Sequence, residues 1–260
     1  MKLCTRHFPF EIGYVNMPFV PSDAGSNSVH EVAHCTDMLR CPLMRTPPDV
    51  YAEYRTMPGL QIHQLRVAAV GKLICEHFRE PIDARSVILA CLFHDMGNII
   101  KSDLAVFPEF LAPHPRSYWE EVQREYIERY GDAAHEATIS IMREMRLPDD
   151  AIALADGVGF SRLAFVRDTS SFEQKVVEYS DLRAGPHGIL PMEERLAESR
   201  ARYRGRRSWA DEGGKDDFAR LADAARDIES QLFAQCSIRP EEITDEKIAP
   251  IVADLKRYQV

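Results

Sequence analysis

The adjacent pair His94-Asp95 is the first place in this sequence where the residue types could do chemistry. Seven apolar residues, Val87 to Phe93, lead directly into it, so an imidazole and a carboxylate stand where the preceding pattern places the core. A buried carboxylate is costly unless it is hydrogen-bonded, ion-paired or bound to a metal, and both groups are ligands of divalent ions. The pair alone also fits a hydrogen bond at a helix end, so a metal site needs ligands from other segments.

Two candidate ligands lie on other predicted helices. His63 lies beside an apolar stripe of helical spacing, and the 31 residues between it and His94 suit a helix hairpin with a short connection. Such a hairpin would bring the two imidazoles opposite each other. Asp181 lies in the last half of a helix that opens with the capping box Ser171-Phe-Glu-Gln174. Its neighbours there are largely apolar, so its carboxylate needs a partner.

The elements that must position these residues are all predicted to be helices. Apolar residues recur at intervals of three and four from Pro58 to the C-terminus, and no strand pattern, internal repeat or glycine-rich phosphate loop stands out. We therefore expect an all-α helical bundle. Residues 1–48 are predicted to be an N-terminal extension, mostly loop; residues 49–210 form the helical domain that holds the site; residues 211–260 form C-terminal helices for packing or for a homodimer.

Composition limits the classes of partner. The chain has 260 residues and a net charge of −9, which argues against general nucleic-acid binding. No apolar run approaches the roughly 18 to 20 residues that cross a bilayer, and the first residues lack the apolar region of a signal peptide, so we expect a cytoplasmic protein with no membrane partner. Six cysteines without a C-x-x-C pair indicate reduced thiols, with Cys75 and Cys91 as core residues.

A second metal motif competes with this one. His30-Glu31-Val32-Ala33-His34 matches the H-E-x-x-H pattern of zinc proteases, and Glu53 follows at a spacing that suits a third ligand. The motif needs a stable helix that places both imidazoles on one face, but Pro42 ends this segment within about two turns. A short solvated helical turn is the simpler interpretation.

In order and in context, the first set of residues resembles the HD-domain superfamily of metal-dependent phosphohydrolases. His94-Asp-Met-Gly97 is close to the usual His-Asp-x-Gly of that family. The segment from His63 resembles its first helix, and Lys175-Val-Val-Glu-Tyr-Ser-Asp181 resembles its closing helix. The resemblance covers roughly residues 55 to 205, and four ordered ligands are far more specific than the pair alone.

The resemblance implies a divalent ion held by His63, His94, Asp95 and Asp181. The ion would be Mn, Fe, Co, Ni, Zn or Mg, and imidazole and carboxylate ligands discriminate little among the late divalent ions. It would activate water to cleave a phosphate ester of a nucleotide or another small phosphorylated metabolite. His135 resembles the third histidine of two-metal members, but no histidine stands in the region 156–160 where the fourth is expected. We therefore expect one ion, with His135 as the candidate ligand of a second.

One phosphate contact of the family is replaced here. Asn98 follows the His-Asp-x-Gly motif where a lysine is often found. Arg66, Lys101 and Arg183 are the candidates to supply the positive charge beside the substrate, and Asp95 completes the expected catalytic set.

Two other functions stay open at this point. Some members of the superfamily are di-iron oxygenases, a function that needs the full histidine set. The alternative from another class is a sensor or binding module whose metal is structural, and retained ligand binding without turnover would distinguish it.

Overall fold

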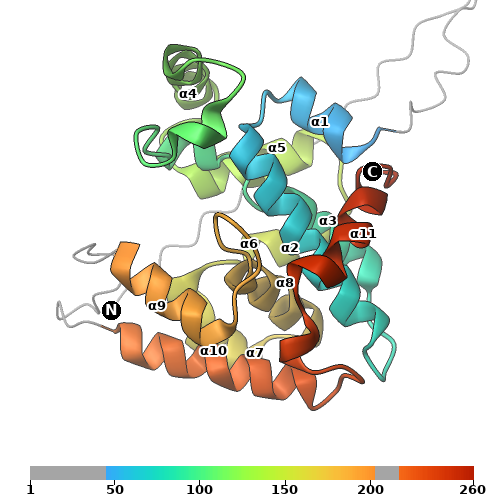
Figure 1. Cartoon of the computed structure of the whole chain (residues 1–260). Helices are drawn as coiled ribbons and strands as arrows, with labels where there is room; N and C mark the ends of the chain where they lie inside the picture. Colours follow the sequence, from blue (N-terminus) through green and yellow to red (C-terminus); the bar gives the residue numbers. More distant parts are fainter. Residues whose placement is uncertain (1–44, 203–216) are drawn as a thin grey trace, which may run out of the picture. The chain divides into compact units, whose positions relative to one another are not determined.

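Two helices, α2 (Pro58–Glu76) and α3 (Ala84–Phe93), form the predicted hairpin in the computed structural model, which describes residues 45–202 and 217–260. Pro58 begins α2, where its fixed φ suits the first helical position. Asp83 caps α3, because its carboxylate accepts a hydrogen bond from the Ser86 backbone N–H at 3.1 Å. The two helices pack along each other and are joined by a short connection (Figure 1).

Helix α3 is buried on every side. Its residues from Ser86 to Phe93 are all buried, as expected for a helix that is apolar all round. Helix α2 packs on one side, α6 (Asp149–Asp156) on another, and α8 (Phe172–Arg183) on a third. The predicted core positions Cys75 and Cys91 are confirmed, since both are buried free thiols.

Helix α8 closes the arrangement by packing against both α2 and α3. Ser171 caps it as predicted, with its hydroxyl accepting from the Gln174 N–H at 3.3 Å. Asp181 lies in the C-terminal half of this helix. Three helices that meet in this way can each contribute a side chain to one point.

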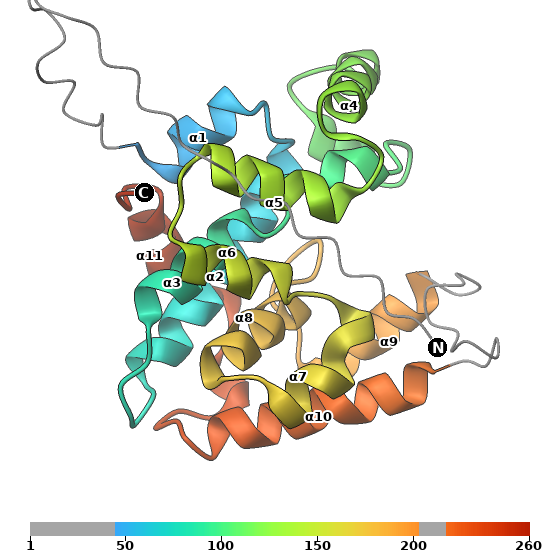
Figure 2. The same cartoon turned by 180° about the vertical axis from the view of Figure 1, so that it is seen from behind.

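The other elements surround this centre (Figure 2). Helix α4 packs on α5 and on two short 3₁₀ helices, η1 and η2; α7 and α9 pack on α10; and α11 packs on α2. Their bounds are α1 Pro47–Glu53, η1 Asn98–Lys101, η2 Pro108–Leu111, α4 Arg116–Tyr130, α5 Ala134–Glu144, η3 Phe160–Arg162, α7 Leu163–Thr169, α9 Met192–Arg202, α10 Phe218–Phe233, η5 Pro240–Glu242 and α11 Asp245–Leu255.

The all-α prediction is confirmed. Within residues 45–202 and 217–260 there is no strand, and the pairs Phe78–Cys236 and Ala184–Ile189 form only isolated bridges. The C-terminal helices α10 and α11 belong to the same compact unit, Leu43–Val260, as the helices of the site. None of the helices that the structure describes has the length and apolar character needed to cross a membrane.

Candidate metal centre

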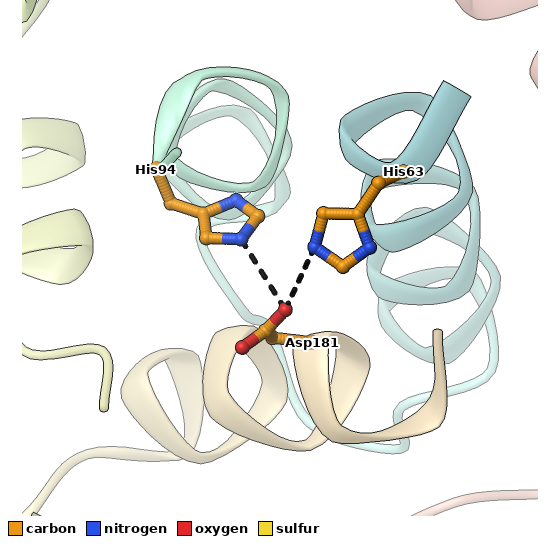
Figure 3. Close-up of side chains that lie close together, drawn as sticks. All are labelled: His63, His94 and Asp181. Atoms are coloured by element: carbon orange, nitrogen blue, oxygen red, sulfur yellow. Dashed lines mark ion pairs between the residues drawn. The ribbon is translucent and has the colours of Figure 1, made fainter. Parts of the chain in front are cut away.

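The imidazoles of His63 and His94 converge on the carboxylate of Asp181 (Figure 3). His63 Nε2 lies 3.0 Å and His94 Nε2 lies 3.3 Å from the same oxygen, Asp181 Oδ1. One ligand atom from each of the three residues lies within 4.8 Å of the others, a separation that one metal ion can bridge. The predicted helix hairpin thus does bring His63 opposite His94, with their rings 5.4 Å apart.

Asp95 borders this group of three. Its Oδ2 lies 3.6 Å from the Nε2 atoms of both His63 and His94. The Asp95 backbone N–H donates to the Gln64 side-chain oxygen at 3.2 Å, which ties the residue to α2. Three of the four expected ligands therefore converge as a set, and Asp95 lies against both imidazoles at a longer distance.

The turn that carries the pair depends on Gly97. A Cβ at this position would lie 2.2 Å from the Ala134 carbonyl oxygen and 2.8 Å from the Thr138 nitrogen. The Gly97 N–H donates to the Thr138 hydroxyl at 2.9 Å. Only glycine allows this approach to the first turn of α5, so His-Asp-x-Gly is a packing requirement as well as a sequence motif.

The tautomer of His94 shows that the group fits a cation. His94 Nδ1 lies 3.0 Å from the Cys91 carbonyl oxygen, so Nδ1 carries a proton that it donates there. Nε2 then points its lone pair at Asp181, and among the described residues this buried atom has no hydrogen-bond partner. A lone pair that faces a carboxylate oxygen is repelled unless a proton or a metal ion lies between them. The donor set, two imidazoles and carboxylate oxygens, suits late divalent ions.

Without a cation, a proton takes this place. Burial lowers the pKa of His94, but the charge of Asp95 and the neighbouring carboxylate of Asp181 raise it more, to about 9. Burial raises the pKa of Asp181, yet its contacts with His63 and His94 lower it further, so this pKa lies well below its usual range. The metal-free centre therefore binds a proton tightly at neutral pH.

Protonation of His94 makes the stability of the metal-free protein depend on pH. Because the folded pKa of His94 lies above the ordinary 6.5, its stabilising effect is fully present below pH 6.5 and is lost as the pH rises through 9. The loss is about 3 kcal/mol. Asp181 does not interfere, since a lowered carboxyl pKa removes stability only in acid.

Urea unfolding of the metal-free protein and of His94→Gln, at steps from pH 6.5 to 9.5, checks this expectation. The glutamine does not titrate, so the stability advantage of the wild type should shrink over that interval. A difference that stays constant with pH would show that His94 is not protonated in the folded chain.

Glu178 is a buried acid that the sequence reasoning missed. It is 1% exposed, and its Oε2 accepts a hydrogen bond from the Gly159 N–H at 2.9 Å. Burial raises the pKa of Glu178 to about 7, although the hydrogen bond from Gly159 lowers it. Glu178 lies three residues before Asp181, a spacing that places both carboxylates on one face of the helix, and this spacing could have indicated Glu178 from the sequence.

His135, the candidate ligand of a second ion, lies outside the group of three. Its Nε2 lies 2.8 Å from Asp156 Oδ1, and both side chains are exposed. The first turn of α5 nevertheless packs against the turn at Gly97. The second ion stays a prediction.

The prediction that Arg183 contacts the phosphate does not fit the structure. Its side chain is buried, and its guanidinium donates to the Tyr179 hydroxyl and to the carbonyl oxygens of Leu190, Pro240 and Ile243. Through these hydrogen bonds the guanidinium attaches α8 to the segment that precedes α11. The group is therefore not available to a substrate, because it is buried and four of its five N–H donors are already engaged.

The other two candidate cations lie differently. Arg66, one turn after His63 on α2, donates to the carbonyl oxygens of Pro186 and His187 at 3.1 and 3.3 Å. It holds the loop that follows α8 in place. Lys101, at the end of η1, is exposed, and no ion pair engages it in the part of the chain that the structure describes.

The competing zinc-protease motif is only partly visible. His30 and His34 lie outside the described residues. Glu53, its expected third ligand, lies in α1 and pairs with Arg45 at 2.8 Å.

The structure is an all-α domain in which three helices bring two imidazoles and a carboxylate close enough together to hold one metal ion. Residues 60–180 match the family model of the HD domain, and this part of the chain belongs to the HD superfamily of metal-dependent phosphohydrolases. The match contains His63, His94 and Asp95 and ends one residue before Asp181. A search of curated proteins and a search of solved structures each gave no match.

Proposed function

We propose that this protein hydrolyses a phosphate ester of a small metabolite, with His63, His94 and Asp181 holding a divalent ion and Asp95 completing the site. The observation that carries the proposal is the buried His94 Nε2, which faces Asp181 Oδ1 without a hydrogen-bond partner among the described residues. An HD domain with this donor set supports metal-dependent hydrolysis more than any other chemistry.

When bound, the ion lowers the pKa of water and offsets charge on the phosphoryl group. The residues of the chain provide the rest. Asp95 Oδ2, beside both imidazoles, orients the attacking water and accepts its proton. The water oxygen bonds to phosphorus, the ester P–O bond breaks, and the alcohol leaves with the proton. Exposed Lys101, which follows the His94 turn, attracts the anionic substrate.

Phosphate release tests this function directly. The protein, purified without chelator, is given a panel of phosphate esters with each divalent ion in turn. Release should require the ion, and Asp95→Asn should lower kcat by about 10²-fold or more, the usual contribution of a general base. Asp254→Asn, the same change at an exposed position of α11, is the matched control.

Three results would oppose the proposal. Release that is indifferent to Asp95 would remove that residue from the mechanism. Two irons per chain with substrate-dependent oxygen consumption would favour the oxygenase. Binding of esters without turnover for every ion would favour the binding module.

A further inference from the structure

Three aromatic rings form a cluster between two loops of the domain. Phe107, just before η2, and Phe110, within η2, have ring centres 5.3 Å apart. The ring of His187, in the loop that follows α8, lies 5.9 Å from Phe107 and 5.4 Å from Phe110. We call Phe107, Phe110 and His187 the aromatic clasp, because they join segments about 80 residues apart in the sequence.

The aromatic clasp is attached to α2 on both sides of His63. One turn before His63, Phe110 packs so closely on Gly59 that a Cβ there would lie 2.7 Å from it. One turn after His63, Arg66 holds the carbonyl oxygens of Pro186 and His187. Gly59, His63 and Arg66 follow one face of α2 at spacings of four and three. The clasp therefore lies along the face of α2 that presents His63 to the metal centre.

Apolar and aromatic side chains in the clasp, and next to it or to His63 in the sequence, remain accessible to solvent. Phe107 and Phe110 are only half-buried, and the His187 ring is exposed. Ile62, next to His63, is 47% exposed, and Val106, next to Phe107, is 50% exposed. Accessible aromatic side chains that are attached beside a reaction centre can contact an apolar part of a substrate. The carbonyl oxygens of Pro186 and His187 engage one N–H of each terminal nitrogen of Arg66.

We propose that the aromatic clasp binds an aromatic ring carried by the leaving group of the phosphate ester. The inference rests on the proposed function and specifies its substrate class. The phosphate would lie at the metal centre, and the ring would contact Phe107 and His187 beside His63. Aromatic side chains favour planar rings through offset or edge contacts, whereas an alkyl group gains only burial.

The test compares benzyl phosphate with ethyl phosphate, which differ in the ring. In Phe107→Leu and in His187→Ala, kcat/KM for benzyl phosphate should fall about fivefold, whereas kcat/KM for ethyl phosphate should not change. Phe165→Leu, the same change at an exposed phenylalanine of α7, should alter neither value. An equal fall for both esters, or no fall, would overturn the inference and leave the clasp as a structural contact between loops.

Binding separates this inference from the proposed function. If the wild type hydrolyses no ester of the panel with any ion, the proposed function fails, and saturation-transfer NMR with benzyl phosphate decides the role of the clasp. The inference expects saturation on the ring protons in the wild type and in Phe165→Leu, and its loss in Phe107→Leu. Equal signals in all three proteins, or none in any, would contradict it.

Discussion

Replacing Asp181 with alanine should remove the bound metal and abolish hydrolysis of phosphate esters. Asp181 supplies the only carboxylate in the group of three, and its Oδ1 lies within 3.3 Å of both imidazole nitrogens. Without it, two imidazoles are left to hold the ion, with Asp95 at a longer distance. Elemental analysis should give about one metal per chain in the wild type and none in Asp181→Ala. Phosphate release should fall by about 10³-fold or more.

Two further variants make this result specific. Asp181→Asn keeps the shape of the side chain but weakens it as a ligand, so it should also lose metal. His135→Ala removes an imidazole that pairs with Asp156 outside the group of three, so it should keep one metal per chain. A protein that retains its ion after Asp181→Ala would refute the centre proposed here. Loss of one of two ions in His135→Ala would instead establish a second site.

Much of this centre could be predicted because its parts are set locally. The apolar run before His94 requires a buried helix, and Asp83 and Ser171 cap the helices of the two main ligand segments. The spacing of His63 and His94 then allows little besides a hairpin. Periodicity and capping act within a few residues, so they can be read from the sequence and place the side chains of each helix face.

The arginines could not be assigned in the same way. Arg183 and Arg66 both lie within a few residues of a ligand, and each is a reasonable phosphate contact by proximity. Their actual partners are carbonyl oxygens of distant segments, at Pro240 and Ile243 for Arg183 and at Pro186 and His187 for Arg66. Such partners depend on how loops return to the bundle, which no local pattern specifies. The approach of Gly97 to Thr138 has the same origin.

These contacts connect the C-terminal helices to the candidate metal centre. Arg183 ties the end of α8, two residues after Asp181, to the segment that precedes α11. Asp245, the first residue of α11, accepts a hydrogen bond from the backbone N–H of Ile189. It thereby holds the same loop that Arg66 contacts through hydrogen bonds. The C-terminal helices therefore help to fix the ligand helix and the aromatic clasp, whatever further role they have in assembly.

The largest effect on stability is expected from Arg183→Met. Methionine fills a similar volume but leaves the Leu190 and Ile243 carbonyl oxygens without their donor around a side chain that is 2% exposed. The Pro240 carbonyl oxygen loses Arg183 but keeps the Ile243 N–H. It also removes the N–H that donates to the Tyr179 hydroxyl, while that hydroxyl still donates to Glu229 at 2.7 Å. An unsatisfied buried acceptor costs about 1–3 kcal/mol, so the free energy of unfolding should fall by about 3–5 kcal/mol.

Urea unfolding measures this loss. Arg226→Met is the matched control, because Arg226 is exposed and pairs with Glu193 on the surface; its loss should cost less than about 1 kcal/mol. If Arg183 holds the fold together and does not bind substrate, the fraction of Arg183→Met that remains folded should keep its metal and its KM for phosphate esters. A variant of wild-type stability with a raised KM would return Arg183 to the substrate site.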